Sequence, residues 1–163
     1  YMDRIYFKDY SGLFFLAEGD TTLLIKALKL LQQEGIGTDR NIGNGFFTFD
    51  TDHIELDLPE SNYMMSFSMF WPENSEQLKE LMDGDVAYDF QKRGGWISTS
   101  PYNTYRKNTV HMFMPGSVFK KPIDLHHPII MGNIGDLKPK SLDVAIEHPI
   151  YRSGKSQFIP ITI

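Results

Sequence analysis

Gly35-Ile36-Gly37-Thr38-Asp39-Arg40-Asn41-Ile42-Gly43-Asn44-Gly45 is the stretch from which the fold can be worked out. It sets two Gly-x-Gly units on either side of five residues, so that four of its eleven positions are glycine. Glycine accepts positive φ angles and, having no Cβ, lets a ligand or a second backbone come close to its N–H group. A helix C-cap and a strand-entry bulge would account for the first and last glycine, but not for the two between them. The loop therefore indicates a site where backbone amides and Arg40 meet phosphate.

The residues before this loop predict a helix. Asp20 is a suitable N-cap, and Gly35 a suitable C′ residue, for a helix that runs to about Glu34. Its apolar side chains recur at helical spacing at Leu24, Ala27, Leu28 and Leu31. The glycine loop thus leaves the C-terminal end of a helix.

Segments of alternating or continuous apolar residues predict strands around this helix and a second helix after it. The predicted strands are 4–17, 47–49 with 54–58, 63–71 and 86–98, and the second helix is capped by Asn74 or Ser75. The resulting order of strand, helix, strand, strand, helix, strand predicts an α+β fold of the ferredoxin-like βαββαβ type. We expect this core over residues 1–100. Residues 101–163 are expected to pack on it as a β-hairpin (109–119) and a strand-rich tail (142–146 and 158–163).

Two familiar phosphate loops can be excluded. Arg40 stands where a dinucleotide-binding loop needs its third glycine, and that loop precedes a helix rather than following one. The Gly-Lys-Ser/Thr ending of a P-loop is also missing. Because the dipole at the end of a helix repels phosphate, binding here would rest on loop amides and on Arg40.

Charge is unevenly distributed along the chain, although the net charge is −5. Residues 1–89 carry 6 basic and 17 acidic side chains, whereas residues 90–123 carry 6 basic and no acidic ones. The basic residues of this second segment are Lys92, Arg93, Arg106, Lys107, Lys120 and Lys121. Aromatic residues interleave with them, as in surfaces that bind nucleic acid, although a solvated face would show the same pattern.

Composition excludes several classes of protein. The chain has no cysteine, which rules out disulfides, thiolate metal sites and a cysteine nucleophile. Its longest apolar run, Leu13–Ala17, is far shorter than the roughly 20 residues that span a bilayer. We expect an intracellular, cytoplasmic protein without membrane attachment.

The glycine loop, placed between the first helix and second strand of a ferredoxin-like unit, resembles that of the RAMP superfamily of CRISPR RNA-binding proteins. Three further segments make the resemblance more specific. They are Lys92-Arg93-Gly94-Gly95-Trp96-Ile97, Met112-Phe113 with Gly116-Ser117-Val118-Phe119, and His148-Pro149-Ile150-Tyr151-Arg152-Ser153-Gly154-Lys155. Together with the loop they resemble the C-terminal half of subunit 4 of the Csm complex, the type III-A CRISPR effector.

This resemblance implies a function without catalysis. Such a subunit would help to hold the repeat-derived 5′ handle of CRISPR RNA, and would contact the large cyclase-bearing subunit and the backbone RAMP subunits of the complex. The acidic first segment of the chain would then face a protein partner. No cofactor is implied.

Lysine, arginine and aromatic residues are the candidates for RNA contact, because cations neutralise phosphates and rings stack on unpaired bases. The candidate set is Gly35, Gly37, Arg40, Gly43, Gly45, Lys92, Arg93, Trp96, Tyr102, Tyr105, Arg106 and Lys107. Trp96 lies in a predicted strand, so that a place in the core is the alternative for it.

Two other functions stay open. Some RAMP proteins are guide-processing ribonucleases, so His111 or His53 could act as general base in metal-independent RNA cleavage. His111 alternates with Val110 and Met112, which favours a structural role in a sheet. The histidines lack the spacing of a zinc pair, and we predict no metal site. The remaining alternative is a structural domain whose glycine loop packs against a neighbouring protein.

Overall fold

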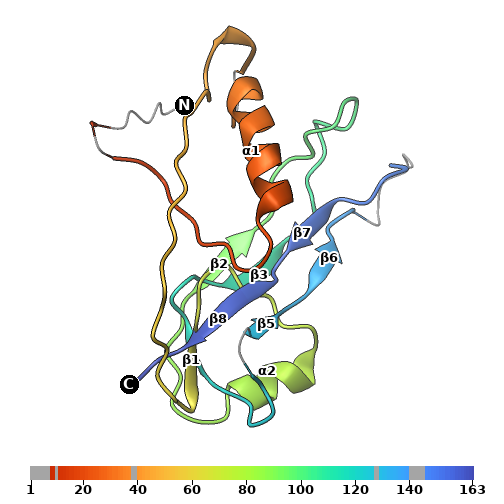
Figure 1. Ribbon diagram of the computed structural model, residues 1–163. Coiled ribbons are helices and arrows are strands. Elements are labelled where there is room, and N and C mark those ends of the chain that lie inside the picture. Colours follow the sequence, from red (N-terminus) through yellow and green to blue (C-terminus); the bar gives the residue numbers. More distant parts are fainter. Residues whose placement is uncertain (1–7, 10, 38–39, 127–128, 140–145) are drawn as a thin grey trace. The chain divides into compact units, whose positions relative to one another are not determined.

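The computed structural model describes residues 8–9, 11–37, 40–126, 129–139 and 146–163. The described part is mixed α/β, with two α-helices and several antiparallel sheets (Figure 1). The chain divides into two compact units, Tyr1–Glu55 (unit 1) and Leu56–Ile163 (unit 2). The domain boundary expected after residue 100 falls within unit 2 and stays a prediction.

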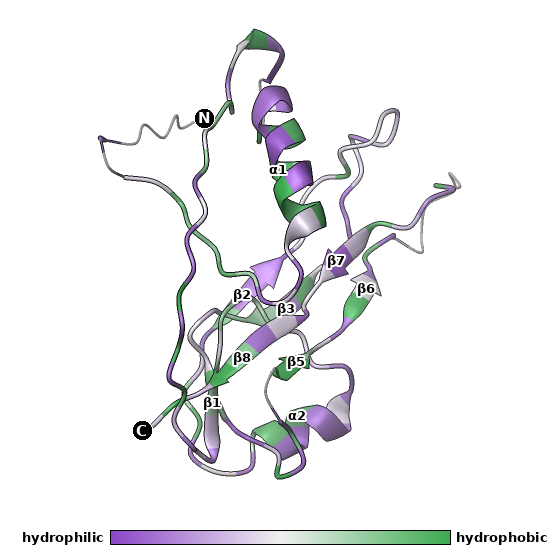
Figure 2. Cartoon of the chain, viewed as in Figure 1, coloured by the Kyte–Doolittle hydropathy of each residue, from purple (hydrophilic) through white to green (hydrophobic). Residues whose placement is uncertain are grey.

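Unit 1 is built around helix α1, Thr22–Glu34, which confirms the predicted helix. The N-cap is Thr21 rather than Asp20, but the Asp20 carboxylate still accepts a hydrogen bond from the backbone N–H of Thr22 at 2.9 Å. Side-chain and backbone hydrogen bonds from Thr22 lower the pKa of Asp20 from its ordinary value. α1 has no buried residue, and Figure 2 shows hydrophobic and hydrophilic residues along it.

The strands predicted on either side of α1 are wrong for the described residues. Residues 8–9, 11–17 and 46–58 contain no strand. Their apolar side chains are largely exposed, as at Leu13 and Phe14, which are 90% and 89% accessible. Alternating apolar and polar residues give a segment one face that can be buried. A strand forms only where a neighbouring strand also pairs with its backbone through hydrogen bonds. The remainder of the predicted first strand, residues 4–7 and 10, lies outside the described residues.

Unit 2 contains a four-stranded antiparallel sheet in the order β4-β1-β8-β5. Its strands are β1 (Tyr63–Ser66), β4 (Val118–Lys120), β5 (Ile129–Met131) and β8 (Ser156–Pro160). Met64 lies opposite Phe119 of β4 and Pro160 of β8, and Ile129 lies opposite Phe158. The predicted strands 63–71 and 158–163 are thus confirmed only in part, and the prediction at 142–145 lies outside the described residues.

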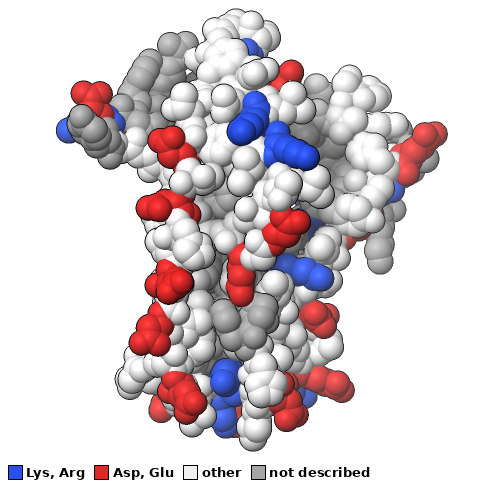
Figure 3. Space-filling model, in the orientation of Figure 1, with Lys and Arg blue, Asp and Glu red and all other residues white. Residues whose placement is uncertain are grey.

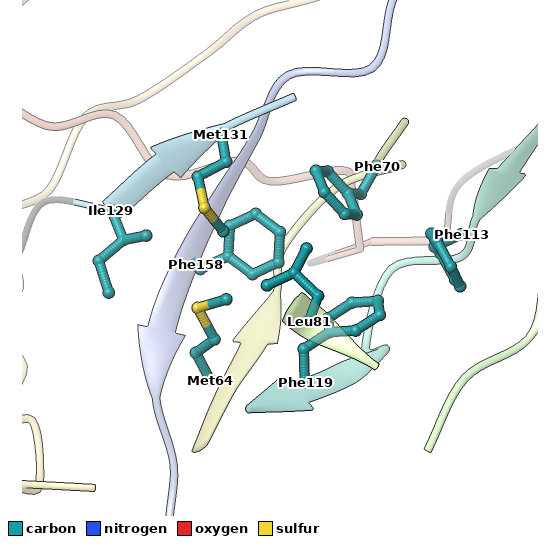
Figure 4. Packing of buried hydrophobic residues seen from close by; sticks show 8 residues of the cluster. All are labelled: Met64, Phe70, Leu81, Phe113, Phe119, Ile129, Met131 and Phe158. Atoms are coloured by element: carbon teal, nitrogen blue, oxygen red, sulfur yellow. The ribbon is translucent and has the colours of Figure 1, made fainter. Parts of the chain in front are cut away.

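Helix α2, Ser75–Leu81, begins as predicted at Asn74, whose side chain accepts a hydrogen bond from the N–H of Gln77 at 2.8 Å. Leu81 carries this helix into the core of unit 2. The core is an apolar cluster contributed by the sheet, by α2 and by the segments joining them (Figure 4). Its buried members are Met64, Phe70, Leu81, Phe113, Phe119, Ile129, Met131 and Phe158.

Two shorter ribbons complete unit 2: β2 (Phe90–Arg93) with β3 (Val110–Phe113), and β6 (Ile134–Asp136) with β7 (Tyr151–Ser153). The predicted hairpin at 109–119 is wrong in its pairing. Both of its strands exist, but β3 pairs with β2 and β4 pairs with β1. At the turn between them, the Gly116 N–H donates to the Ser66 carbonyl of β1 at 2.8 Å.

Among the described residues, no helix is long and apolar enough to span a membrane.

Candidate RNA interface

The glycine loop of unit 1 is closed by its own backbone. The N–H of Gly35 donates to the last turn of α1 at Leu31, and the N–H of Ile36 donates to the carbonyl of Gly45 at 2.8 Å. A Cβ on Gly45 would collide with the backbone of Ile36, and one on Gly35 would lie 3.0 Å from the Asn44 oxygen. The outer glycines of the loop are therefore needed for this close approach of its two ends.

The inner glycines have a different environment. Gly37 and Gly43 adopt positive φ angles of 97° and 87°, and nothing lies within 4 Å of the position that a Cβ would take. Between them the 3₁₀ turn η1 (Arg40–Ile42) carries an exposed Arg40, whose carbonyl accepts the N–H of Gly43 at 3.1 Å. The chain thus has an exposed Arg40 between two glycines whose missing Cβ positions are open to solvent. Thr38 and Asp39 lie outside the described residues.

In unit 2, the segment from Gly95 to Lys107 folds back on itself as a loop, here called the Trp96 loop. Its ends are joined by hydrogen bonds from Lys107 N–H to Gly95 and from Ile97 N–H to Tyr105, at 2.8 and 2.9 Å. Trp96 and Arg106 form the bridge between these bonds. The loop is thus closed at its base, where Trp96 and Arg106 face each other.

Trp96 belongs to the surface, so the alternative of a core position is wrong. Its side chain is 56% exposed, and Cζ of Arg106 lies 4.6 Å from the centre of its ring. A guanidinium over an indole face is a cation–π contact. This pair offers a stacking surface and a positive charge within one small area.

The two tyrosines and the lysine of the Trp96 loop are half-buried. Tyr102 N–H donates to Thr99 at 2.8 Å, and Tyr105 N–H donates to Tyr102 at 3.0 Å, which folds the loop tip into successive turns. Tyr102, Tyr105 and Lys107 therefore lie in the loop with part of each side chain accessible.

Lys92 and Arg93 lie on opposite faces of strand β2, because successive side chains of a strand alternate. Lys92 is exposed and lies directly across from His111 of β3. Arg93 is half-buried, with its Nε 3.0 Å from the sulfur of Met69. The two cations consequently serve different surfaces.

The sequence-predicted residues thus form two groups. Gly35, Gly37, Arg40, Gly43 and Gly45 lie in the glycine loop of unit 1. The other candidates, from Lys92 to Lys107, lie on β2 and on the Trp96 loop that follows it in unit 2. We therefore treat each group as a separate candidate surface.

The described residues contain no candidate metal site, because nowhere among them do three or more histidine or carboxylate side chains come together. His53 is exposed, with Nε2 4.0 Å from the Glu55 carboxylate. Figure 3 shows acidic side chains along the left-hand edge of that view. His148 is also exposed, and its Nδ1 lies 3.1 Å from the Pro149 carbonyl oxygen.

Two exposed aromatic residues close to Lys92 in the sequence are not among the predicted site residues. Tyr88 and Phe90 are 44% and 50% exposed, and their ring centres lie 5.1 Å apart. The signal was present in the sequence, since Tyr88, Phe90 and Lys92 alternate as side chains on one face of a strand do.

Comparison with known proteins matches residues 59–161 to the family described as CRISPR Csm4 C-terminal domain. The chain is 29% identical over 147 residues to the CRISPR system Cms protein Csm4 of Streptococcus thermophilus, covering 86% of this chain and 46% of that protein. It is 26% identical over 136 residues to the protein of the same name from Thermococcus onnurineus (strain NA1), covering 79% of this chain and 44% of that relative. The chain therefore spans less than half the length of these curated relatives, and the match confirms the resemblance seen in the sequence.

Proposed function

Because the chain belongs to the CRISPR Csm4 family, through that family's C-terminal domain, we propose that it is an RNA-binding and scaffold subunit of the type III-A Csm effector complex. In this role it helps to hold the 5′ handle of CRISPR RNA and performs no catalysis. The bases of unpaired RNA can be splayed and stacked on protein side chains.

The observation that carries this proposal is the exposed Trp96 with Arg106 4.6 Å over its ring. An accessible indole beside a guanidinium suits an unpaired base and its phosphate, whereas a buried indole would suit only the core. The surrounding segment 90–123 has no acidic side chain to repel RNA. Electrostatic attraction and stacking thus act at one place.

The glycine loop is the second contact that we propose. The amides of Ile36 and Gly43 are used within the loop, so phosphate would be held by Arg40 and by the amides of Gly37 and Gly45. The proposed RNA-contact residues of the whole chain are Gly35, Gly37, Arg40, Gly43, Gly45, Lys92, Arg93, Trp96, Tyr102, Tyr105, Arg106 and Lys107. Within this set, Gly35 and Gly43 contribute by fixing the conformation of the loop, because their own N–H groups donate to Leu31 and Arg40.

Fold and partners follow from the same proposal. We assign the chain a ferredoxin-like RAMP core, with which its mixed α/β architecture is consistent. The large cyclase-bearing subunit and the backbone RAMP subunits are its protein partners in a cytoplasmic complex. The exposed carboxylates of residues 50–57 are available for such contacts.

Binding of a labelled CRISPR 5′ handle to the full chain, measured by fluorescence anisotropy over a range of salt concentrations, tests the proposal. We expect an affinity that falls steeply with salt, since each phosphate contact on a single strand adds roughly 0.7 to the slope. A duplex DNA of equal length is the control and should bind more weakly. Absence of binding at low salt would contradict direct RNA contact.

The position of His111 keeps a ribonuclease as the second candidate function. His111 is exposed and lies directly opposite Lys92, so a base and a cation share one face of the β2–β3 ribbon. Incubation of repeat RNA with the chain in EDTA separates the two functions. Under the scaffold proposal the RNA stays intact, whereas site-specific cleavage that His111→Ala abolishes would support the ribonuclease.

A further inference from the structure

The β2–β3 ribbon has two unlike faces. On one face Val110 and Met112 are buried with Leu137, and the half-buried Met69 and Trp71 pack against them. Because side chains alternate along a strand, Phe90 and Lys92 of β2 lie on the other face. Their cross-strand partners on β3, Phe113 and His111, lie on that face too. Three residues of this second face, Phe90, Lys92 and His111, are exposed.

The aromatic side chains of this second face are anchored by the core. Phe113 is 2% exposed and lies 4.9 Å, between ring centres, from Phe119 of the core cluster. The ring of Phe90 lies 4.6 Å from that of Phe113, and the ring of Tyr88 lies 5.4 Å from it. Half of Phe90 nevertheless faces solvent. The rings of Tyr88 and Phe90 thus pack against the buried Phe113 and remain accessible to solvent.

Charge on this face favours a polyanion. Lys92 and His111 lie opposite each other next to the rings, and the chain has no Asp or Glu between residues 90 and 123. The nearest acidic neighbour along the strand, Asp89, accepts a hydrogen bond from the backbone N–H of Phe90 at 2.7 Å. A protein partner that covered the aromatic rings would also have to neutralise Lys92.

We propose that Tyr88, Phe90, Lys92 and His111 form a further RNA-binding surface, the aromatic–basic face, which stacks an unpaired base on Phe90 and Tyr88 and holds its phosphate at Lys92. The proposal rests on the RNA-binding function proposed above, in which Lys92 is already a contact, and it adds Tyr88, Phe90 and His111 to that function. Rings already held in place lose little conformational entropy when a base stacks on them.

Photocrosslinking of the full chain to a single-stranded oligouridylate that carries 5-iodouridine tests the inference directly. The expected result is a crosslink, located by mass spectrometry, at Tyr88 or Phe90 in addition to any at Trp96. This readout uses the unaltered protein, so it does not depend on the folding of a variant.

Affinity of two matched variants for the same RNA gives the second measurement. Phe90→Leu is expected to weaken binding roughly tenfold, the loss typical of one stacked base. Tyr151→Leu removes an aromatic side chain that is 68% exposed on β7, outside the face, and is expected to bind as the unaltered chain does. Lys92→Gln, which spares the rings, should weaken binding and reduce its salt dependence.

Three results would overturn the inference. If crosslinks map only to other segments and Phe90→Leu binds like Tyr151→Leu, the RNA-binding function stands and the aromatic–basic face is not part of it. If Phe90→Leu instead impairs association with the Csm subunits at unchanged RNA affinity, the occupant is a protein. If the unaltered chain binds no RNA even at low salt, the proposed function fails together with the inference.

Discussion

The guanidinium carbon of Arg106 lies 4.6 Å from the centre of the Trp96 ring, across the backbone bridge that closes the Trp96 loop. The two residues are ten positions apart, and the hydrogen bonds that hold them together lie on both sides of the bridge. Such a cation–π contact at an exposed site contributes about 0.5–1 kcal/mol. It therefore orients the indole while more than half of the Trp96 side chain stays exposed.

Replacement of Trp96 by leucine is expected to weaken binding of the 5′ handle RNA by roughly tenfold, since a stacked base contributes about 1–3 kcal/mol. Stability should change little because the side chain is 56% exposed. The chain has two tryptophans, and Trp71 is half-buried, so quenching of indole emission by RNA should be strong in the unaltered chain and weak in Trp96→Leu. Equal quenching in both proteins would place the RNA away from Trp96.

Charge reversal in the glycine loop gives a prediction for unit 1. Arg40→Glu should lower RNA affinity strongly and flatten its dependence on salt, because a phosphate contact is replaced by repulsion. Lys26→Glu is the matched control, as it makes the same change of charge at an exposed position of α1. Anisotropy titrations at several salt concentrations measure the RNA affinity of the two variants and its dependence on salt. Equal losses in both would mean that only net charge counts, and that the loop holds no phosphate.

The two helices could be predicted from the sequence because their signals are local. The apolar residues of α1 recur at helical spacing, and Asn74 caps α2 through a bond to Gln77 three residues away. The glycine loop could also be predicted from the sequence. Gly37 and Gly43 have positive φ angles, which favour glycine independently of the surrounding residues.

The strands were harder to predict because pairing is not local. Residues 109–119 look like a hairpin, yet Phe113 lies opposite Phe90 and Val118 lies opposite Met65, each far away in the sequence. The apolar residues at 11–17 have strand-like alternation, yet these residues form no strand. Exposure of Trp96 was likewise undecided, because the bridge to Arg106 depends on how the loop closes.

The packing of Trp71 on the β6–β7 ribbon predicts a steric effect at Gly135. A Cβ at Gly135 would collide with the six-membered ring of Trp71, and the backbone has no positive φ to add strain. Gly135→Ala is therefore expected to destabilise unit 2 by about 1–3 kcal/mol, the usual cost of overpacking. Gly12→Ala, with nothing within 4 Å of its new methyl group, is the control. Urea denaturation of both variants measures the difference, and a stable Gly135→Ala would contradict the packing.

Acid should loosen the pairing of β6 with β7 through Asp136. Its carboxylate accepts hydrogen bonds from the backbone N–H groups of Ile150 and Lys138, at 2.8 and 2.9 Å. These bonds, that from Ile150 first, hold the pKa of Asp136 below its ordinary value of 3.8. A lowered pKa in the folded state means that the carboxylate stabilises the fold above that value, and that this contribution is lost as the pH falls below it.

Hydrogen exchange of the Ile150 amide as a function of pH measures this effect. Its protection should decline as the pH falls below the ordinary value of 3.8 and the folded carboxyl takes up a proton. Asp136→Asn, which cannot ionise, should show weaker protection at neutral pH and no such decline. If the amide of Ile150 is equally protected at all pH values in both proteins, the carboxylate does not hold the two strands together, and the register of Tyr151 with Asp136 must be maintained by the backbone ladder alone.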